Sequence, residues 1–450
     1  MNKYADFLAS KEWKPIAAGF APGSLHSNLK PFQKQCVRRA CERGRAAIFA
    51  DCGLGKTFMQ LEWAREVALH TGKPVLLLAP LAVGRQTLAE AHHWEYARVR
   101  VVRHQNELDE DTEIAITNYE MLSHFDSSQF GGIVLDESSI LKSYSGKFRQ
   151  EVTEWAENVD FRLCCSATPA PNDLIEITNH SEFLGVMNGK EVIAQFFIQD
   201  GNTTQKYRLR RHAVRPFYRW MASWATAVRM PSDLNDTDDG YVLPPLDVVQ
   251  HTVAGQAVDG DLFAMEAQTL QERQKARKAS IGERVAAAAA IANAAEGPVL
   301  VWCGLNDESK ALTDAITDAI EVTGSDAAEK KTDALLGFSS GEHRVLVTKP
   351  SIGGWGMNWQ HCNTMVFVGL SDSFEEYYQA VRRCWRFGQA RPVTAHVICA
   401  DTEGAVVRNI RRKQEMVETM MTELAQHMGD EYRASVKQVY HRPRIIEIPE

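Results

Sequence analysis

Short apolar runs alternate with amphipathic runs along most of this chain, and this alternation constrains its fold more than any other feature. Short apolar runs bounded by turn residues are typical of buried strands, and the runs between them repeat apolar residues at helical spacing. Alternating strands and helices build parallel sheets covered by helices. The strands expected in the first half are "AAIFA", "PVLLLAP", "IAITNY", "GIVLDE" and "FRLCCSATP", and those in the second half are "GPVLVWCG", "HRVLVTKP", "TMVFVGL" and "VTAHVICA".

A stretch without this rhythm, from about Leu174 to Val285, separates the two halves. The sequence therefore predicts an α/β protein with two parallel-sheet domains and a partly helical insertion between them. A chain of 450 residues is also too long for one ordinary core. The expected divisions are a first domain at 1–178, an insertion and linker at 179–285, a second domain at 286–425 and a C-terminal tail at 426–450.

Composition places the chain among globular proteins, with 44% hydrophobic and 24% charged residues. The N-terminal stretch lacks the apolar core of a signal peptide, and the longest weakly polar run, "VAAAAAIANAA", is too short to span a bilayer. Nine cysteines without C-x-x-C pairs indicate free thiols. We therefore expect a cytoplasmic protein.

The net charge of −8 excludes a polycation, so any nucleic-acid contact requires a local cluster of basic residues. Such a cluster lies between Thr203 and Met230, where basic and aromatic residues interleave and no acid occurs. We predict that Arg208, Arg210 and Arg211 contact a phosphate backbone. Trp220 and Trp224 lie four residues apart, and we expect them to pack in a core rather than to stack on bases.

The stretch "FADCGLGKTFMQ" (Phe49 to Gln60) combines a strand end, a glycine turn and a helix start. Backbone N–H groups converge there, and the helix dipole adds partial positive charge. Gly53 and Gly55 permit a tight turn, Lys56 can reach the β- and γ-phosphates, and the Thr57 hydroxyl can bind Mg²⁺. Ala50 departs from the strict phosphate-loop pattern, but the flanking strand and helix favour a nucleoside triphosphate site.

Polar side chains follow two further strands. Asp136 and Glu137 end "GIVLDESS" at the edge where α/β sheets present ligands. Asp136 is expected to hold Mg²⁺, and Glu137 to orient or deprotonate an attacking water. Ser166 and Thr168, in "CSATPAPN", are candidates for sensing the γ-phosphate and relaying its loss. Each feature is common at strand ends, and their combination with the phosphate loop favours nucleotide hydrolysis.

The second half carries a basic run, "QAVRRCWRFGQ", from Gln379 to Gln389. Arg383 and Arg386 are three residues apart, which predicts that they share a helical face. Guanidinium groups from a second domain would stabilise charge on a transferring phosphoryl group, as an arginine finger does. In the preceding "SIGGWGMNW", Gly354 belongs to a loop that brings backbone close to a ligand or a neighbouring domain.

In this order the motifs resemble those of superfamily 2 helicases, and within them the Swi/Snf-type DNA translocases. The similar segments are "LKPFQ", "ADCGLGKT", "LLLAPLAVGRQ", "ITNYEML", "DESSILKS", "SATPAPN", "GGWGMNW" and "QAVRRCWRFGQARPV". The resemblance implies that Gln33 reads adenine and that Lys142 belongs to the acid-box segment, where we count it among the DNA contacts. It also places Gln379 with Arg383 and Arg386 among the catalytic residues, and Gly354 with Ser166 and Thr168 among the coupling residues.

The resemblance further implies two RecA-like domains with ATP and Mg²⁺ in the cleft between them. Closure on ATP and opening after hydrolysis would walk the protein along double-stranded DNA. Two alternatives stay open, a strand-separating DNA or RNA helicase and a nucleotide-dependent scaffold that grips DNA without stepping. Short chains of this kind resemble phage-encoded or bacterial members, which implies the cytoplasm of a bacterial cell or a phage-infected host.

Overall fold

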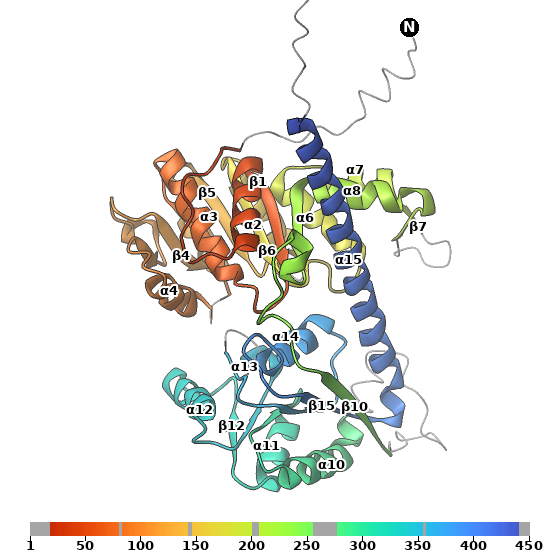
Figure 1. Ribbon diagram of the computed structural model, residues 1–450. Coiled ribbons are helices and arrows are strands. Elements are labelled where there is room, and N and C mark those ends of the chain that lie inside the picture. Colours follow the sequence, from red (N-terminus) through yellow and green to blue (C-terminus); the bar gives the residue numbers. More distant parts are fainter. Residues whose placement is uncertain are drawn as a thin grey trace, which may run out of the picture. The chain divides into compact units, whose positions relative to one another are not determined.

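The computed structural model describes residues 19–80, 83–142, 146–199, 207–254, 277–353 and 357–440, without the side chains of 328 and 429–440 (Figure 1). It divides into two compact units. Unit 1 comprises the described parts of Met1–Ala170, Leu174–Asp238 and Val417–Glu450, and unit 2 comprises Pro171–Asp173 and the described parts of Asp239–Met416. None of the helices in these ranges combines the length and the apolar character that a membrane span requires.

Unit 1 is built on a seven-stranded parallel sheet with the strand order β3-β4-β2-β5-β6-β1-β9. The central strands are buried along almost their whole length, as expected for a parallel sheet covered on both faces. The strands are β1 (Arg45–Ala50), β2 (Val75–Ala79), β3 (Val99–Val101), β4 (Ile114–Asn118), β5 (Gly132–Asp136), β6 (Phe161–Ser166) and β9 (Ala225–Val228).

Two helices of unit 1 have end residues that are typical of those positions. α2 starts at a proline, whose missing N–H is harmless in the first turn, and α3 ends before Gly72 in the left-handed conformation. The helices are α2 (Pro31–Arg43), α3 (Lys56–Thr71), α4 (Gly84–His93), α5 (Gly146–Ala156), α6 (Ile177–Leu184), α7 (Gly189–Phe196) and α8 (Val214–Trp224). A short antiparallel pair, β7 (Phe197–Gln199) and β8 (Tyr207–Leu209), lies between α7 and α8 in the chain.

Unit 2 contains a six-stranded parallel sheet with the order β10-β15-β14-β11-β13-β12. Its strands are β10 (Leu246–Val253), β11 (Val299–Trp302), β12 (Ala319–Val322), β13 (Val345–Thr348), β14 (Thr364–Val368) and β15 (Val393–Ala400). Its helices are α10 (Ile281–Ala294), α11 (Asn306–Ala315), α12 (Ala328–Ser340), α13 (Pro350–Gly353), α14 (Phe374–Cys384) and the first part of α15 (Gly404–Tyr440).

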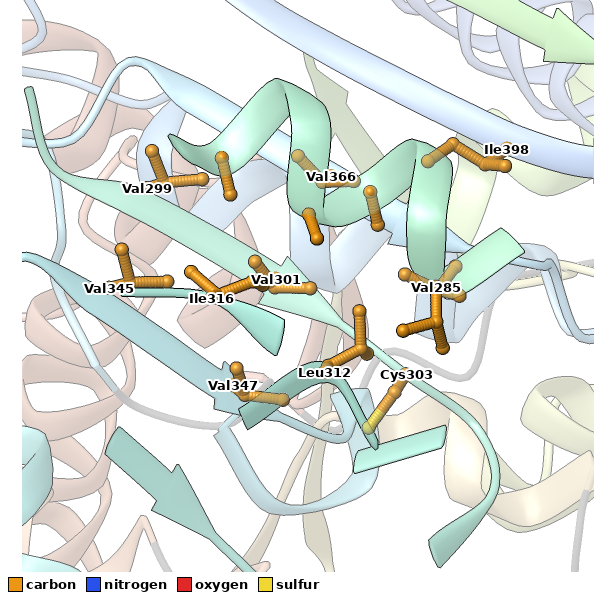
Figure 2. Close-up of a cluster of buried hydrophobic side chains, with 14 residues drawn as sticks. Val285, Val299, Val301, Cys303, Leu312, Ile316, Val345, Val347, Val366 and Ile398 are labelled. Carbon is orange, nitrogen blue, oxygen red and sulfur yellow. The ribbon is translucent and has the colours of Figure 1, made fainter. Parts of the chain in front are cut away.

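The core of unit 2 lies between α10 and the sheet (Figure 2). Helix α10 contributes Val285, Ala288, Ala289 and Ala292, whose spacing places them on one face. Alternate residues of the central strands point toward that face, because side chains of a strand alternate between its two sides. Those residues are Val299 and Val301 of β11, Val345 and Val347 of β13, and Val366 and Val368 of β14.

The predicted α/β class with two parallel sheets is confirmed, and each of the nine expected strands is present. The middle stretch, in which no alternation of strands and helices was predicted, nevertheless contributes one strand to each parallel sheet. β9 pairs with β1 in unit 1, and β10 pairs with β15 in unit 2. Neither showed the expected pattern, because β9 has only four residues and β10 is an edge strand with most side chains exposed.

The unit boundaries also differ from the predicted divisions at residues 178, 285 and 425. Residues 179–199 and 207–238 belong to unit 1 rather than to a separate insertion, and α15 continues through the predicted tail to Tyr440. From Val417 onward α15 is part of unit 1. There the Met428 sulfur accepts a hydrogen bond from the Ala227 N–H at 3.0 Å, and Arg229 donates to the Thr422 hydroxyl at 2.7 Å.

Helix α3 is buried nearly all round, and two of its buried acids hold the segment that precedes α2. Glu62 accepts from the His26 N–H at 2.7 Å and from the Tyr96 hydroxyl at 2.6 Å, and Glu66 accepts from the Gly23 N–H at 2.7 Å. Arg65 pairs with both carboxylates. Burial opposes ionisation of Glu62, but these hydrogen bonds and the Arg65 charge outweigh burial and lower its pKa.

Glu62→Gln is expected to destabilise unit 1 by about 2 kcal/mol at pH 7, because it removes a buried charge that accepts several hydrogen bonds. Since the pKa of Glu62 is lowered in the folded state, its stabilisation is present above the ordinary value of 4.5 and is lost as the pH falls through the folded pKa. Thermal melting at pH 7 and near pH 4 measures this difference.

The matched control is Glu113→Gln, which breaks the exposed pair with Arg98 and should have little effect at either pH. The predicted pH dependence is wrong if the difference in melting temperature between Glu62→Gln and the parent stays constant from pH 7 to pH 4.

Candidate nucleotide-binding site

The predicted phosphate loop joins β1 to α3. The chain leaves β1 at Ala50, and both Gly53 (φ 87°) and Gly55 (φ 77°) adopt the left-handed conformation that favours glycine. Helix α3 begins at Lys56, so its first N–H groups face the loop. The Lys56 ammonium donates to the carbonyls of Ala50 at 2.9 Å and Asp51 at 3.3 Å. The loop thus has the strand, turn and helix start that the sequence predicted.

Gln33 of α2 packs directly against this loop. Its Nε2 donates to the Leu54 carbonyl at 2.9 Å, and its Oε1 accepts from the Lys30 N–H at 2.9 Å. A Cβ at Gly55 would lie 2.4 Å from Gln33 Nε2, so a side chain there would displace the Gln33 amide, and the φ of 77° itself favours glycine. The structure brings Gln33 to the phosphate loop, and its reading of adenine stays a prediction.

The acid pair lies at the carboxyl end of β5. Asp136 is 5% exposed, and its Oδ1 accepts from Gln60 Nε2 at 2.7 Å and from the Glu137 N–H at 3.1 Å. Burial raises the pKa of Asp136, and the Gln60 hydrogen bond and the Lys56 charge oppose that rise. Within unit 1 the structure therefore brings the acid pair and the phosphate loop together, as the sequence predicted.

Glu137, half-buried, has a φ of 51°, which is rare for a residue with a side chain. Such backbone strain is concentrated at functional sites, where the surrounding structure maintains it. The hydroxyl of Tyr119, in the 3₁₀ turn Tyr119–His124, donates to the Asp136 carbonyl at 2.5 Å. Gln60 and Tyr119 were not among the predicted site residues.

The two predicted hydroxyl residues follow β6. Ser166 Oγ accepts from the Thr168 N–H at 3.1 Å, and both side chains are fully buried. Within the described residues, Thr168 Oγ1 has no hydrogen-bond partner. A buried hydroxyl without a partner in the protein needs an explanation, and a ligand or a water is one. Their roles in coupling stay predictions.

In unit 2, Gln379 and Arg383 form a buried pair on α14. Arg383 Nη2 donates to Gln379 Oε1 at 2.9 Å, and its Nη1 donates to the Met357 carbonyl at 3.1 Å. The prediction that Arg383 and Arg386 share a helical face was wrong, because α14 ends at Cys384. Trp385 follows the last helical residue, and its indole donates to the Pro244 carbonyl at 2.7 Å. Arg386 lies beyond the helix and is half-buried.

Gly354, the predicted coupling residue of the second half, lies outside the described residues. Lys142, the predicted contact in the acid-box segment, ends the 3₁₀ turn Ser138–Lys142 and is half-buried.

The three predicted DNA-contact arginines surround one open cavity in unit 1. Its volume is about 540 Å³, and it is lined by Ile198, Arg208, Arg210, Arg211 and His212. Arg208 and Arg211 are exposed, and Arg210 is half-buried. Trp220 and Trp224 are buried at 6% and 1% exposure, which confirms that they pack in the core. The basic and aromatic residues of this stretch therefore separate, with the arginines outside and the tryptophans inside.

Two family models match successive parts of the chain. Residues 32–206 match the family model described as the SNF2-related domain, and residues 283–388 match the helicase conserved C-terminal domain. A search of curated proteins found no match. The solved structure of the Sulfolobus solfataricus SWI2/SNF2 ATPase core in complex with dsDNA is similar at 15% identity and a TM-score of 0.43, covering 90% of this chain and 96% of that chain.

The two matched domains follow each other in the order that the motifs predicted, and together they span well over half of the chain. The chain belongs to the Swi/Snf-type family of superfamily 2 helicases and is an ATP hydrolase.

Proposed function

We propose that this ATP-dependent nucleic-acid motor moves along double-stranded DNA without separating the strands. The observation that carries the proposal is the assembly within unit 1 of the phosphate loop and the acid pair, joined by the 2.7 Å hydrogen bond from Gln60 to Asp136. A motor needs its phosphate contacts and its catalytic acids in one rigid unit, since small displacements of catalytic groups cause large losses of rate.

The residues of unit 1 fit ATP and Mg²⁺. The left-handed glycines and the start of α3 form a cradle of N–H groups for phosphates, and Lys56 adds a positive charge there. The Thr57 hydroxyl and the Asp136 carboxylate are hard oxygen ligands of the kind that Mg²⁺ prefers. Bound Mg²⁺ would neutralise charge on the phosphates. In this proposal Glu137 orients the attacking water, while Ser166 and Thr168 respond to the γ-phosphate.

Residues of unit 2 complete the proposed mechanism. Arg383 and Arg386 would act on the same nucleotide when the two units close on it, and they would stabilise charge on the transferring phosphoryl group. Arg383 is held in place by Gln379, which accepts from its Nη2 at 2.9 Å and from its Nε, through the backbone carbonyl, at 3.0 Å. Arg386 lies beyond the end of α14 and is half-buried, and we assign it the more direct role.

The cavity lined by arginines is the proposed DNA contact of unit 1. Within the described residues, Arg208, Arg210 and Arg211 form no ion pair or side-chain hydrogen bond. Most other arginines of this unit have partners, such as Arg229 with Asp233 and Arg65 with two glutamates. Clustered cations without acids repel one another, and a phosphate backbone relieves that repulsion. Lys142 stays a predicted DNA contact.

We favour translocation over strand separation because of the burial of aromatic side chains in one segment. Separating strands requires an element that unstacks bases, at ~1.4 kcal/mol for each base-pair step in DNA. The aromatic-rich candidate is Tyr207 to Trp224, and in it Phe217, Tyr218, Trp220 and Trp224 are buried. Among the described residues this stretch therefore offers little aromatic surface for a wedge.

Two alternatives give different experimental outcomes. A strand-separating helicase would unwind a forked duplex, whereas a nucleotide-dependent scaffold would bind DNA without sustained hydrolysis. The scaffold is disfavoured because each described catalytic position holds a chemically competent side chain.

Location in the cytoplasm of a bacterial cell or a phage-infected host stays a prediction.

The proposal is tested by steady-state ATP turnover with no nucleic acid, with duplex DNA, with single-stranded DNA and with RNA. We expect duplex DNA to stimulate turnover most, because phosphate contacts on a duplex would favour closure. Turnover that is no faster with any nucleic acid than without would favour the scaffold.

In the same assay, Arg386→Ala should lower turnover by about 10³-fold, the scale of an arginine finger, and leave ATP binding largely intact. Arg391→Ala is the control, since Arg391 is exposed on the same unit and, within the described residues, its side chain bonds only the His361 carbonyl. Turnover by Arg386→Ala within a few-fold of the parent would remove this residue from the mechanism.

Replacing Arg208, Arg210 and Arg211 together with glutamine should weaken DNA binding without regard to sequence. Each lost phosphate contact should flatten the slope of log affinity against log salt by about 0.9. Fluorescence anisotropy of labelled duplex DNA over a range of salt concentrations measures the slope.

The control for this triple variant replaces Arg98 and Arg100, which are exposed but paired with Glu113 and Asp109. An unchanged slope in the triple variant would show that the arginine cavity does not contact the DNA backbone.

A further inference from the structure

We propose that Gln60 and Tyr119 are positioning residues that hold the two catalytic acids, Gln60 acting on the metal ligand and Tyr119 on the base. The inference rests on the proposed roles of Asp136 and Glu137. Neither positioning residue needs to touch the nucleotide, and each acts through one hydrogen bond to Asp136.

Gln60 ties the metal-binding carboxylate to the phosphate loop. It lies four residues after Lys56, so both side chains project from one face of α3. Its Nε2 donates to Asp136 Oδ1 at 2.7 Å, which fixes the rotation of that carboxylate. Partners of this kind orient metal ligands and are typically worth tenfold to a hundredfold in metal affinity or activity.

The burial of Gln60 argues that it is not there for stability alone. The side chain is fully buried, and its Oε1 has no hydrogen-bond partner within the described residues. A buried polar atom without a partner is unfavourable, and a methionine of similar length would avoid it. The position thus holds a residue whose amide oxygen has no partner within the described residues and whose amide nitrogen donates a hydrogen bond to Asp136.

Tyr119 acts on the peptide that joins the two acids. Its hydroxyl donates to the Asp136 carbonyl, and the N–H of the same peptide, from Glu137, donates to Asp136 Oδ1. Both polar ends of one peptide plane are therefore held. Glu137 leaves this plane with a φ of 51°, a conformation that persists only where its surroundings enforce it. Without the Tyr119 hydroxyl, the carbonyl end of this plane would lose its restraint, and only the Glu137 N–H end would stay bonded to Asp136 Oδ1.

The position of Tyr119 also connects the acids to another strand end. Tyr119 follows β4, and β2 lies between β4 and β5 in the sheet, so the hydroxyl reaches across the end of β2. A ligand that displaced the turn Tyr119–His124 would therefore disturb the hydrogen bond from Tyr119 to the Asp136 carbonyl. This gives the turn after β4 a direct route to the catalytic base.

Tyr119→Phe removes only the hydroxyl. We expect it to lower kcat for ATP about tenfold, with KM for ATP and the Mg²⁺ concentration for half-maximal activity within twofold of the parent. Gln60→Met is expected to act differently, raising the half-maximal Mg²⁺ concentration tenfold or more. A purely structural role would not produce this division between kcat and metal dependence.

Tyr96→Phe is the matched control, because Tyr96 is also buried and its hydroxyl donates to a carboxylate of α3, that of Glu62, at 2.6 Å. It should lower the melting temperature and leave kcat within twofold. Equal loss of kcat in Tyr96→Phe and Tyr119→Phe, or no loss in Tyr119→Phe, would overturn the role of Tyr119. Unchanged Mg²⁺ dependence in Gln60→Met would overturn the role of Gln60.

Glu137→Gln tests the underlying assignment separately. If that variant keeps full turnover, the proposed role of Glu137 fails whatever the positioning variants do. If Tyr119→Phe does not fold, as judged by its melting temperature, the Mg²⁺ dependence of Gln60→Met alone decides whether Asp136 is positioned from α3.

Discussion

The hydrogen bond from Gln60 to Asp136 connects the two parts of unit 1 on which the proposed chemistry depends. One partner lies on α3, which begins with the phosphate-loop lysine, and the other ends β5. Because α3 is buried nearly all round, it cannot shift without disturbing both the sheet and the segment before α2. The same helix therefore fixes the proposed phosphate cradle, the carboxylate proposed to bind Mg²⁺ and, through Glu62 and Glu66, the segment that leads to Gln33.

The strand order explains why the remaining groups meet at the same edge. In a parallel sheet all carboxyl ends lie on one side, and β5, β6 and β1 are neighbours. Asp136 ends β5, Ser166 ends β6 and Ala50 ends β1, so the acid pair, the hydroxyl turn and the phosphate loop share one edge. Side chains from segments far apart in the sequence converge there without long loops.

Much of this could be predicted from local patterns. The glycine turn between a strand and a helix, and two acids after four apolar residues, carry their signals within a few residues. Gln60 and Tyr119 could not be predicted in this way, because each matters through a partner 76 or 17 residues away. The end of α14 before Arg386 coincides with a hydrogen bond from Trp385 to the distant Pro244, which no local pattern shows. β9 and β10 lacked a pattern because one is short and the other exposed.

We propose that this motor moves along duplex DNA without separating the strands. This proposal is tested most directly by two assays under one ATP condition, displacement of the third strand from a DNA triplex and unwinding of a forked duplex. We expect ATP-dependent triplex displacement with little unwinding, because phosphate contacts suffice for stepping and the aromatic side chains of Tyr207 to Trp224 are mostly in the core. Efficient unwinding of the fork without triplex displacement would contradict the proposal.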